Sequence, residues 1–127
     1  MGNFRELIVW QKSVSFVTEI YKLTEDFPKN EIFGLTSQIR RAAVSVPSNI
    51  SEGHSRRSSL DYLQFLKISR GSLAELETQL LISKNLRYVS EENYVNFDEK
   101  IIELSKMLNA LITSISKTSP KNLIPNS

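Results

Sequence analysis

Apolar residues recur every three or four positions along most of this chain, which is the period of amphipathic α-helices, and they divide it into four segments. The clearest repeat lies in the last segment, where spacings of three and four alternate without a break. Its members are Tyr94, Phe97, Ile101, Leu104, Leu108, Leu111 and Ile115. The sequence therefore predicts a long helix with a coiled-coil-like seam, capped by Ser90, with Glu91 and Glu92 favoured by the helix dipole in its first turn.

The first segment predicts a helix from about Leu7 to Phe27. Pro28 ends it, because a residue that precedes proline is pushed out of the helical region. Two adjoining apolar stripes run along this helix, formed by Trp10, Val14, Val17 and Tyr21 and by Val9, Phe16, Ile20 and Leu23. A face of this width usually contacts two neighbouring helices.

The third segment predicts a helix that Ser58 caps and that extends to Leu86 or Arg87. Its inner face consists of Tyr62, Phe65, Leu66, Leu73, Leu76 and Leu80. Gly71 lies inside this helix at a cost of about 1 kcal/mol relative to alanine. Close approach of another helix is the simplest reason for a glycine there.

The second segment organises the chain, because two different stripes share its surface. It starts either at Asn30 or only after Gly34, with Thr36 as its cap, and it ends at about Gly53. The apolar stripe consists of Ile39, Ala43, Val46 and Ile50. The polar stripe has Arg41 at its edge. It consists of Gln38, Ser45, Asn49 and Glu52. Side chains at such a boundary are partly buried and need hydrogen-bond partners.

Pro47 lies in the middle of this second helix, where proline is costly. It cannot donate a hydrogen bond to the carbonyl of Ala43, so we expect the helix to kink there. Either the Ser45 hydroxyl or a water molecule is expected to satisfy the freed carbonyl. The polar stripe and the proline in mid-helix together indicate that this helix has a role beyond packing in the core.

Four long amphipathic helices with short connections predict an all-α fold, an antiparallel up-down-up-down four-helix bundle with its second helix kinked at Pro47. No segment has the pattern of a strand or a repeat. The bundle is expected to span residues 1–117 as one domain. Residues 118–127, with Pro120 and Pro125, are expected to form a disordered tail.

Composition narrows the classes of protein to which this chain can belong. The chain has 127 residues and no cysteine, which excludes disulfides, thiolate metal sites and a cysteine nucleophile. The start of the chain lacks the apolar core of a signal peptide, and no apolar run has the length of a membrane span. A cytoplasmic protein without a membrane partner is therefore expected.

The sequence gives little support for catalysis. Its single histidine, His54, follows Glu52 at a spacing that does not match the Glu-x-x-His pairs of bundles that hold two metal ions. There is no glycine-rich phosphate loop and no Gly-x-Ser-x-Gly elbow. We expect no enzyme, no metal, no cofactor and no small-molecule substrate.

Charge gives better support for nucleic-acid binding. The net charge is only +2, but basic residues are in excess between residues 28 and 57. Arginine suits contact with phosphate. The candidates are Arg40, Arg41, Arg56, Arg57 and Arg70. The alternative is ordinary solvated surface charge, paired in part with Glu52, Asp61 or Glu75.

Self-association is the other hypothesis. Val44 and Pro47 are predicted to lie away from the apolar stripe of the second helix, and exposed apolar positions on long helices often mark a subunit interface. The polar stripe fits an internal hydrogen-bond network and a polar subunit interface equally well. Two functions are therefore carried forward: an oligomer that binds RNA or a ribonucleoprotein partner through a basic face, and a protein–protein scaffold that binds no nucleic acid.

Several motifs in the chain resemble those of a bacterial family of four-helix-bundle proteins. They include Phe4-Arg5-Glu6-Leu7 with Val9-Trp10-Gln11-Lys12, the run from Gly34 to Ala43, the run from Val44 to Gly53, and Gly71-Ser72-Leu73 with Glu75-Leu76-Glu77. This is the family of proteins encoded in intervening sequences of 23S rRNA genes, and the likeness covers nearly the whole chain before the tail.

The resemblance implies an antiparallel bundle that assembles into a homopentameric barrel. The accessory factor of diversity-generating retroelements, a basic pentamer that engages reverse transcriptase and nucleic acid, is related; this sequence departs from it in its mild net charge. The family motif falls on Gln38, Arg40, Arg41, Ser45, Pro47, Asn49, Glu52 and Gly53. It implies structural or interface roles for the polar stripe, Pro47 and Gly53, and it brings no catalytic residue.

Overall fold

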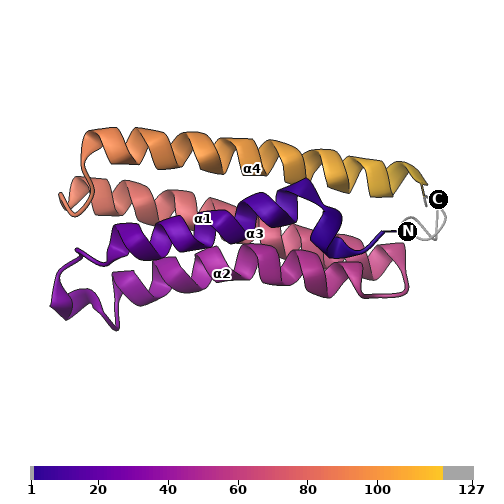
Figure 1. The fold of residues 1–127 in the computed structure, drawn as a ribbon, viewed down its shortest axis with the longest axis horizontal. Helices are drawn as coiled ribbons and strands as arrows, with labels where there is room; N and C mark the ends of the chain where they lie inside the picture. Colours follow the sequence, from indigo (N-terminus) through magenta and orange to yellow (C-terminus); the bar gives the residue numbers. More distant parts are fainter. Residues whose placement is uncertain (1, 119–127) are drawn as a thin grey trace.

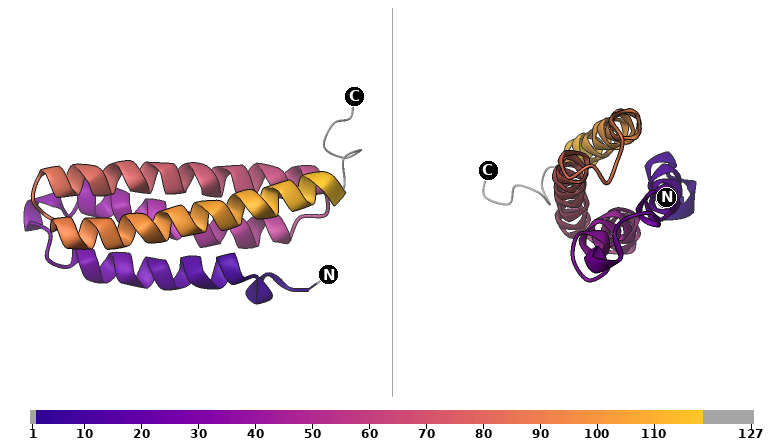
Figure 2. Two further views of the ribbon diagram at one scale, coloured as in Figure 1. Left: turned by 90° about the horizontal axis from the view of Figure 1, so that it is seen from above. Right: turned by 90° about the vertical axis from the view of Figure 1, so that its left-hand side faces the viewer.

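Four α-helices form an antiparallel bundle in the computed structural model, which describes residues 2–118 (Figure 1). They are α1 (Ile8–Thr24), α2 (Leu35–His54), α3 (Ser59–Asn85) and α4 (Glu91–Thr118), with short 3-10 helices η1 (Phe4–Glu6) and η2 (Lys29–Glu31). Seen along the bundle, α2 lies between α1 and α3, and α3 lies between α2 and α4 (Figure 2). This confirms the predicted fold class. Most of the predicted tail lies outside the described residues.

The helix starts follow from local hydrogen bonds. The Ser58 hydroxyl accepts from the backbone N–H of Asp61 at 3.1 Å, and that of Ser90 accepts from Asn93 at 3.1 Å, so both predicted caps are confirmed. Between the two alternatives for α2, the helix begins after Gly34. The proposed cap at Thr36 was wrong, because Gly34 takes the cap position and the Glu31 carboxylate accepts from the N–H of Leu35 at 3.1 Å.

The end of α1 comes at Thr24, three residues before the predicted Phe27. The Thr24 hydroxyl donates to the carbonyls of Ile20 and Tyr21. The backbone then tightens, because the N–H of Glu25 donates to the carbonyl of Lys22. The chain thus leaves the helix before proline requires it, and Pro28 stands at the cap of η2 instead.

The core lies along the bundle axis and draws on all four helices. Its largest fully buried side chains are Ile20, Ile39, Ile50, Leu66, Leu73, Leu76, Leu80, Ile101 and Leu108. The predicted seam of α4 is confirmed, since Phe97, Ile101, Leu104 and Leu108 are buried, and Tyr94, Leu111 and Ile115 pack against them. Within the described residues, no helix has the length and hydropathy required to cross a bilayer.

Pro47 is buried inside an α2 that runs unbroken from Leu35 to His54. The expectation that it lies away from the apolar face was wrong, whereas Val44 is 39% exposed. Neighbouring carbonyls gain side-chain donors, with the Ser69 hydroxyl 2.9 Å from the carbonyl of Val46 and the Asn49 amide 2.8 Å from that of Ser45. The bend expected at Pro47 stays a prediction.

The close helix contact that the sequence predicted at Gly71 occurs at Gly53 instead. Gly71 is exposed, and a Cβ added there would meet nothing within 4 Å, so the expected close approach of a helix was wrong. A Cβ on Gly53 would lie 2.7 Å from Cβ of Phe65 and 3.0 Å from the Tyr62 ring. Gly53, predicted as a helix stop and, from the family motif, as a structural or interface residue, is the position where α3 approaches α2 too closely for a side chain.

Candidate functional site

The turn between α2 and α3 carries two of the predicted arginines. The Arg56 guanidinium is 2.9 Å from the Glu52 carboxylate and lies over the Phe65 ring, 4.8 Å from its centroid. Both partners of this ion pair are about half exposed, so solvent screens it and it contributes little stability. Arg57 is exposed and forms no ion pair or side-chain hydrogen bond with another described residue.

Arg70 extends this basic surface along α3. Its guanidinium donates to the side-chain oxygen of Asn109 on α4 at 3.0 Å. An amide carries no charge, so the contact orients the guanidinium without neutralising it. Lys67 is exposed one turn earlier on α3.

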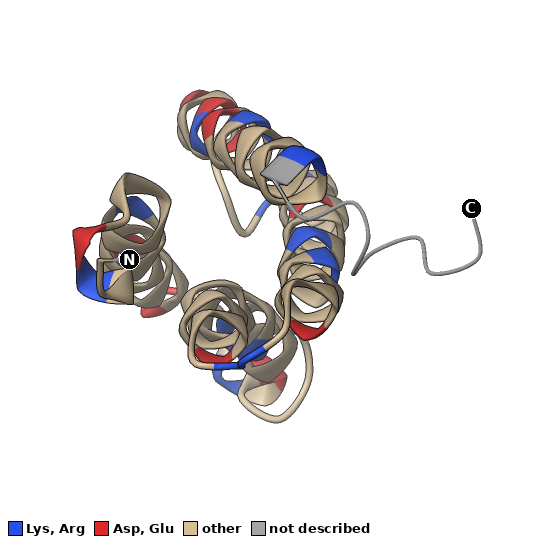
Figure 3. Ribbon diagram, turned by 90° about the vertical axis from the view of Figure 1, so that its right-hand side faces the viewer, with Lys and Arg blue, Asp and Glu red and all other residues tan. Residues whose placement is uncertain are grey.

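Because α4 runs antiparallel to α3, it brings two further lysines to this half of the bundle. Lys106 and Lys117 are exposed on α4, on either side of Asn109 in the sequence. Sequence reasoning missed them, although the antiparallel pairing of α3 and α4 was a signal that could have found them. Figure 3, which views this end, shows basic positions on α3, on α4 and at the turn after α2.

We call this surface the basic end. It consists of Arg57, Lys67, Arg70, Lys106 and Lys117, with Arg56 beside it. Apart from Arg56, none of these residues forms an ion pair within residues 2–118. In this half of the bundle basic residues outnumber acidic ones, and the reverse holds in the other half. The net charge of the chain is therefore small, but positive charge is in excess in one half of the bundle and negative charge in the other.

The structure does not bring Arg40 and Arg41 to the basic end. They lie in the first half of α2, and Arg40 is about 24 Å from Arg56 along the helix at 1.5 Å per residue. The Arg40 side chain donates to the Thr24 hydroxyl at 2.8 Å and to the Tyr21 carbonyl at 3.2 Å, and it covers the Tyr21 ring. It thereby satisfies groups at the carboxyl end of α1, where a cation is favourable.

The polar stripe of α2 divides into a partly buried centre and exposed ends. The Asn49 amide donates to the Ser45 hydroxyl at 2.8 Å, and the Ser72 hydroxyl of α3 donates to the same oxygen at 2.8 Å. The centre thus forms an internal hydrogen-bond network between α2 and α3. Gln38 and Glu52, at the ends of the stripe, are exposed.

A groove of about 470 Å³ lies beside this network, between the first half of α2 and α3. Its walls carry opposite charges, since Arg41 comes from α2 and Glu75 from α3. Phe33 stands at its edge with 94% of its side chain exposed. Sequence reasoning missed Phe33, although an aromatic residue in a short polar connection was an available signal.

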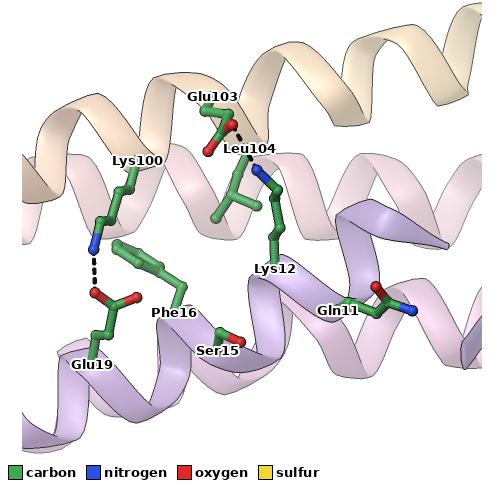
Figure 4. A pocket seen from close by; sticks show the side chains of 8 residues that line it. All are labelled: Gln11, Lys12, Ser15, Phe16, Glu19, Lys100, Glu103 and Leu104. Atoms are coloured by element: carbon green, nitrogen blue, oxygen red, sulfur yellow. Dashed lines mark hydrogen bonds and ion pairs between the residues drawn. The ribbon is translucent and has the colours of Figure 1, made fainter.

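A second groove, of about 380 Å³, separates α1 from α4 (Figure 4). Phe16 and Leu104 form its apolar floor. Lys12 of α1 pairs with Glu103 of α4 at 2.9 Å. A further ion pair joins Glu19 to Lys100. Both pairs are partly exposed and connect α1 with α4 across the groove, where solvent screens them.

Titratable groups with shifted pKa values lie apart from one another. Burial raises the pKa of Tyr62. Burial, with a hydrogen bond and charge repulsion from Asp98, raises the pKa of Glu77. The hydrogen bond to Glu31 at 3.0 Å, helped by desolvation, raises the pKa of Tyr88. These three groups belong to different parts of the bundle and form no common site.

The histidine and the acidic residues form no metal cluster among residues 2–118. His54 instead packs against aromatic rings, with ring centroids 5.6 Å from Tyr62 and 6.3 Å from Phe4. Its imidazole therefore belongs to the packing of η1 on the end of α2 and the start of α3.

Comparison with known proteins gives a matching family and solved structures with the same fold. The profile of the 23S rRNA-intervening sequence proteins matches residues 5–110. A crystal structure of a protein of unknown function from the S23 ribosomal protein family of Bacteroides thetaiotaomicron superimposes with a TM-score of 0.78 and 26% sequence identity, over 84% of this chain and 96% of that one. A comparison with curated proteins finds no match.

Proposed function

The chain belongs to the 23S rRNA-intervening sequence protein family, and we propose that it is a non-enzymatic, cytoplasmic homo-oligomer that binds RNA through its basic end. The observation that carries the proposal is the group of five cations without ion-pair partners in the described residues: Arg57, Lys67, Arg70, Lys106 and Lys117. A pentamer is the assembly that the resemblance implies.

Electrostatics supports phosphate as the ligand of these residues. An unpaired exposed cation keeps its full charge for an external anion, and clustered cations release counterions from RNA when they bind. The acidic excess in the opposite half repels a polyanion, so the molecule is expected to approach RNA with the basic end. Arg70 is oriented in advance by Asn109, which lowers the entropic cost of holding a guanidinium on a phosphate.

Arg40 and Arg41 are not part of the proposed RNA surface. Arg40 is engaged at the end of α1, and Arg41 borders the groove beside Phe33 in the opposite half of the bundle. Arg56 remains as a peripheral member, because Glu52 partly neutralises it.

A protein–protein scaffold without RNA binding is the second candidate, and the exposed Phe33 favours it. An aromatic side chain that is 94% exposed is unusual for a residue with no role, and aromatic residues are enriched in protein interfaces. A protein-binding surface at Phe33 is also compatible with RNA binding, since the two surfaces occupy opposite ends of the bundle.

RNA binding measured by fluorescence anisotropy tests the proposal. The probes are 23S rRNA fragments and an unrelated RNA of equal length, each at low and near-physiological salt. A Lys67→Ala/Lys117→Ala variant is compared with Lys22→Ala/Lys29→Ala, which makes the same change in net charge at the other end. We expect the first variant to bind at least about tenfold more weakly and the second to bind as wild type does.

Two outcomes contradict the proposal. If the wild type does not bind RNA at low salt, the scaffold is the better account. If the two double variants lose affinity equally, binding follows net charge and the basic end has no special role. Light scattering on the same samples shows whether each variant keeps the mass of the wild type.

A further inference from the structure

Phe33 and its neighbours form an apolar patch that no part of the described chain covers. Phe33 is 94% and Ile32 is 57% exposed, in the connection between η2 and α2. Arg41 lines the same groove as Phe33, is exposed, and forms no ion pair within residues 2–118. We call Ile32, Phe33 and Arg41 the Phe33 patch. It combines an aromatic ring with a cation that forms no ion pair in the described chain, with Glu75 on the opposite wall of the groove.

A recess of about 390 Å³ at the same end of the bundle has the complementary chemistry. It lies between the second half of α1 and the start of α4, and its lining includes Leu23, Tyr88, Phe97, Glu19, Lys22 and Asp26. The first three give it apolar walls. Asp26 is exposed and forms no ion pair with a described residue, so a carboxylate is available at the rim.

We propose that the Phe33 patch of one copy docks into this recess on a second copy, with Phe33 against Leu23 and Phe97 and Arg41 beside Asp26. Charge complementarity identifies the occupant, because the guanidinium and carboxylate left unpaired within one copy neutralise each other between two. Both surfaces belong to the end that holds η2 and the α3–α4 turn, at the left of Figure 1. Copies that stand side by side in the same direction therefore bring them to the same level.

The proposed contact is heterologous. The patch belongs to the α2 side of the bundle and the recess to α1 and α4, so each copy uses two different surfaces. Such contacts close into a ring when the rotation between neighbours allows it. The inference rests on the oligomeric part of the proposed function and specifies the surfaces that build the oligomer. In this arrangement the basic ends of all copies face the same way.

Light scattering of purified full-length protein tests the contact. We expect the wild type to be an oligomer and Phe33→Ala to dissociate towards the 14.5 kDa single chain, with a dissociation constant raised at least about tenfold. Leu60→Ala is the matched control, because Leu60 is 39% exposed at the opposite end of the bundle. Since Phe33 touches solvent on nearly all sides, circular dichroism should show unchanged helicity in Phe33→Ala.

A charge exchange tests the choice of recess. Arg41→Glu and Asp26→Arg should each weaken the oligomer, and the double variant should restore its mass. If Phe33→Ala keeps the wild-type mass, the patch is not the interface. If Phe33→Ala dissociates but the double variant is no better than the single ones, the assigned recess is wrong.

A wild type that is monomeric overturns both the contact and the oligomeric part of the proposed function. Anisotropy with RNA reports separately on the basic end, so its result distinguishes a failed interface from a failed RNA site.

Discussion

The two ends of the bundle differ in the sign of their excess charge and in what their charged groups contact. At the basic end, Arg57, Lys67 and Lys117 reach solvent without an acidic partner in the described chain. At the opposite end, the Arg40 guanidinium holds α1 through the Thr24 hydroxyl, and Lys84 pairs with Glu91. The first arrangement leaves an excess of positive charge available to an external anion. At the opposite end Arg40 and Lys84 join elements of the same chain, and although Arg41 forms no ion pair in the described chain, acidic residues outnumber basic ones there.

The comparison separates arginines that look alike in the sequence. Arg40 and Arg57 belong to two Arg-Arg pairs, and both were predicted to meet phosphate. Only the neighbours supplied by other helices show that Arg40 has internal partners and that Arg57 has none among the described residues. Substitutions at both ends of the bundle test this difference.

Gly53→Ala is expected to destabilise the basic end most strongly. The new Cβ would lie 2.7 Å from Cβ of Phe65, so α2 and α3 must separate just before the arginine-bearing turn. Overpacking of this kind costs about 1–3 kcal/mol of unfolding free energy. Urea unfolding followed by circular dichroism measures it.

Gly71→Ala is the matched control for that substitution. An added Cβ meets nothing there within 4 Å, so the change should stabilise the helix by about 0.5–1 kcal/mol. A loss of stability in Gly71→Ala, or none in Gly53→Ala, would contradict the packing described for the two glycines.

Arg40→Ala and Arg57→Ala should have opposite consequences. Arg40→Ala removes hydrogen bonds to the Thr24 hydroxyl and the Tyr21 carbonyl and should cost about 1–2 kcal/mol of stability, with RNA affinity unchanged. Arg57→Ala should change stability by less than about 0.5 kcal/mol and weaken RNA binding. Urea unfolding and anisotropy on both variants check this, and equal effects of the two on either quantity would remove the distinction between the ends.

The salt dependence of RNA affinity should show the same difference between the two ends of the bundle. Loss of one phosphate contact in Arg57→Ala is expected to reduce the slope of log affinity against log salt by about 1. Lys29→Ala, at the opposite end, should leave the slope as it is. Titrations at four salt concentrations suffice, and a shallower slope in the Lys29 variant would show that RNA also reaches the acidic half.

The smallest effect concerns Tyr88, whose hydroxyl donates to Glu31 at 3.0 Å and whose pKa is raised above 10 mainly by that bond. The folded state therefore holds the phenol proton more tightly than the unfolded state. The hydrogen bond from the Tyr88 hydroxyl to Glu31 contributes fully to stability below pH 10. This contribution is lost as the pH rises through the pKa of Tyr88 in the folded state. Tyr88→Phe should abolish that part of the decline in thermal stability as the pH rises above 10; an unchanged profile would count against the bond.

The sequence predicted the four helices because each buries a continuous apolar face with a helical period, and it predicted the Ser58 and Ser90 caps because these depend on residues three positions away. Predictions failed where the deciding partner belongs to another element. The Glu31 carboxylate replaced Thr36 at the start of α2, and Tyr62 and Phe65 gave Gly53 the close contact expected at Gly71.

The candidate site was predicted only in part for the same reason. Local charge identified Arg56, Arg57 and Arg70. It could not show that α4 adds Lys106 and Lys117, because that follows from the antiparallel pairing of distant segments. Phe33 was not predicted, because an aromatic residue in a connection indicates a binding surface only once its exposure is known.

Ultraviolet cross-linking of the wild-type protein to a 23S rRNA fragment, followed by mass spectrometry of the peptides, shows whether RNA binds the basic end. We expect RNA attached to peptides from residues 55–71 and 105–117, and absent from peptides that cover η2 and the first half of α2. Cross-links confined to η2, to Arg41 or to the start of α4 would contradict it.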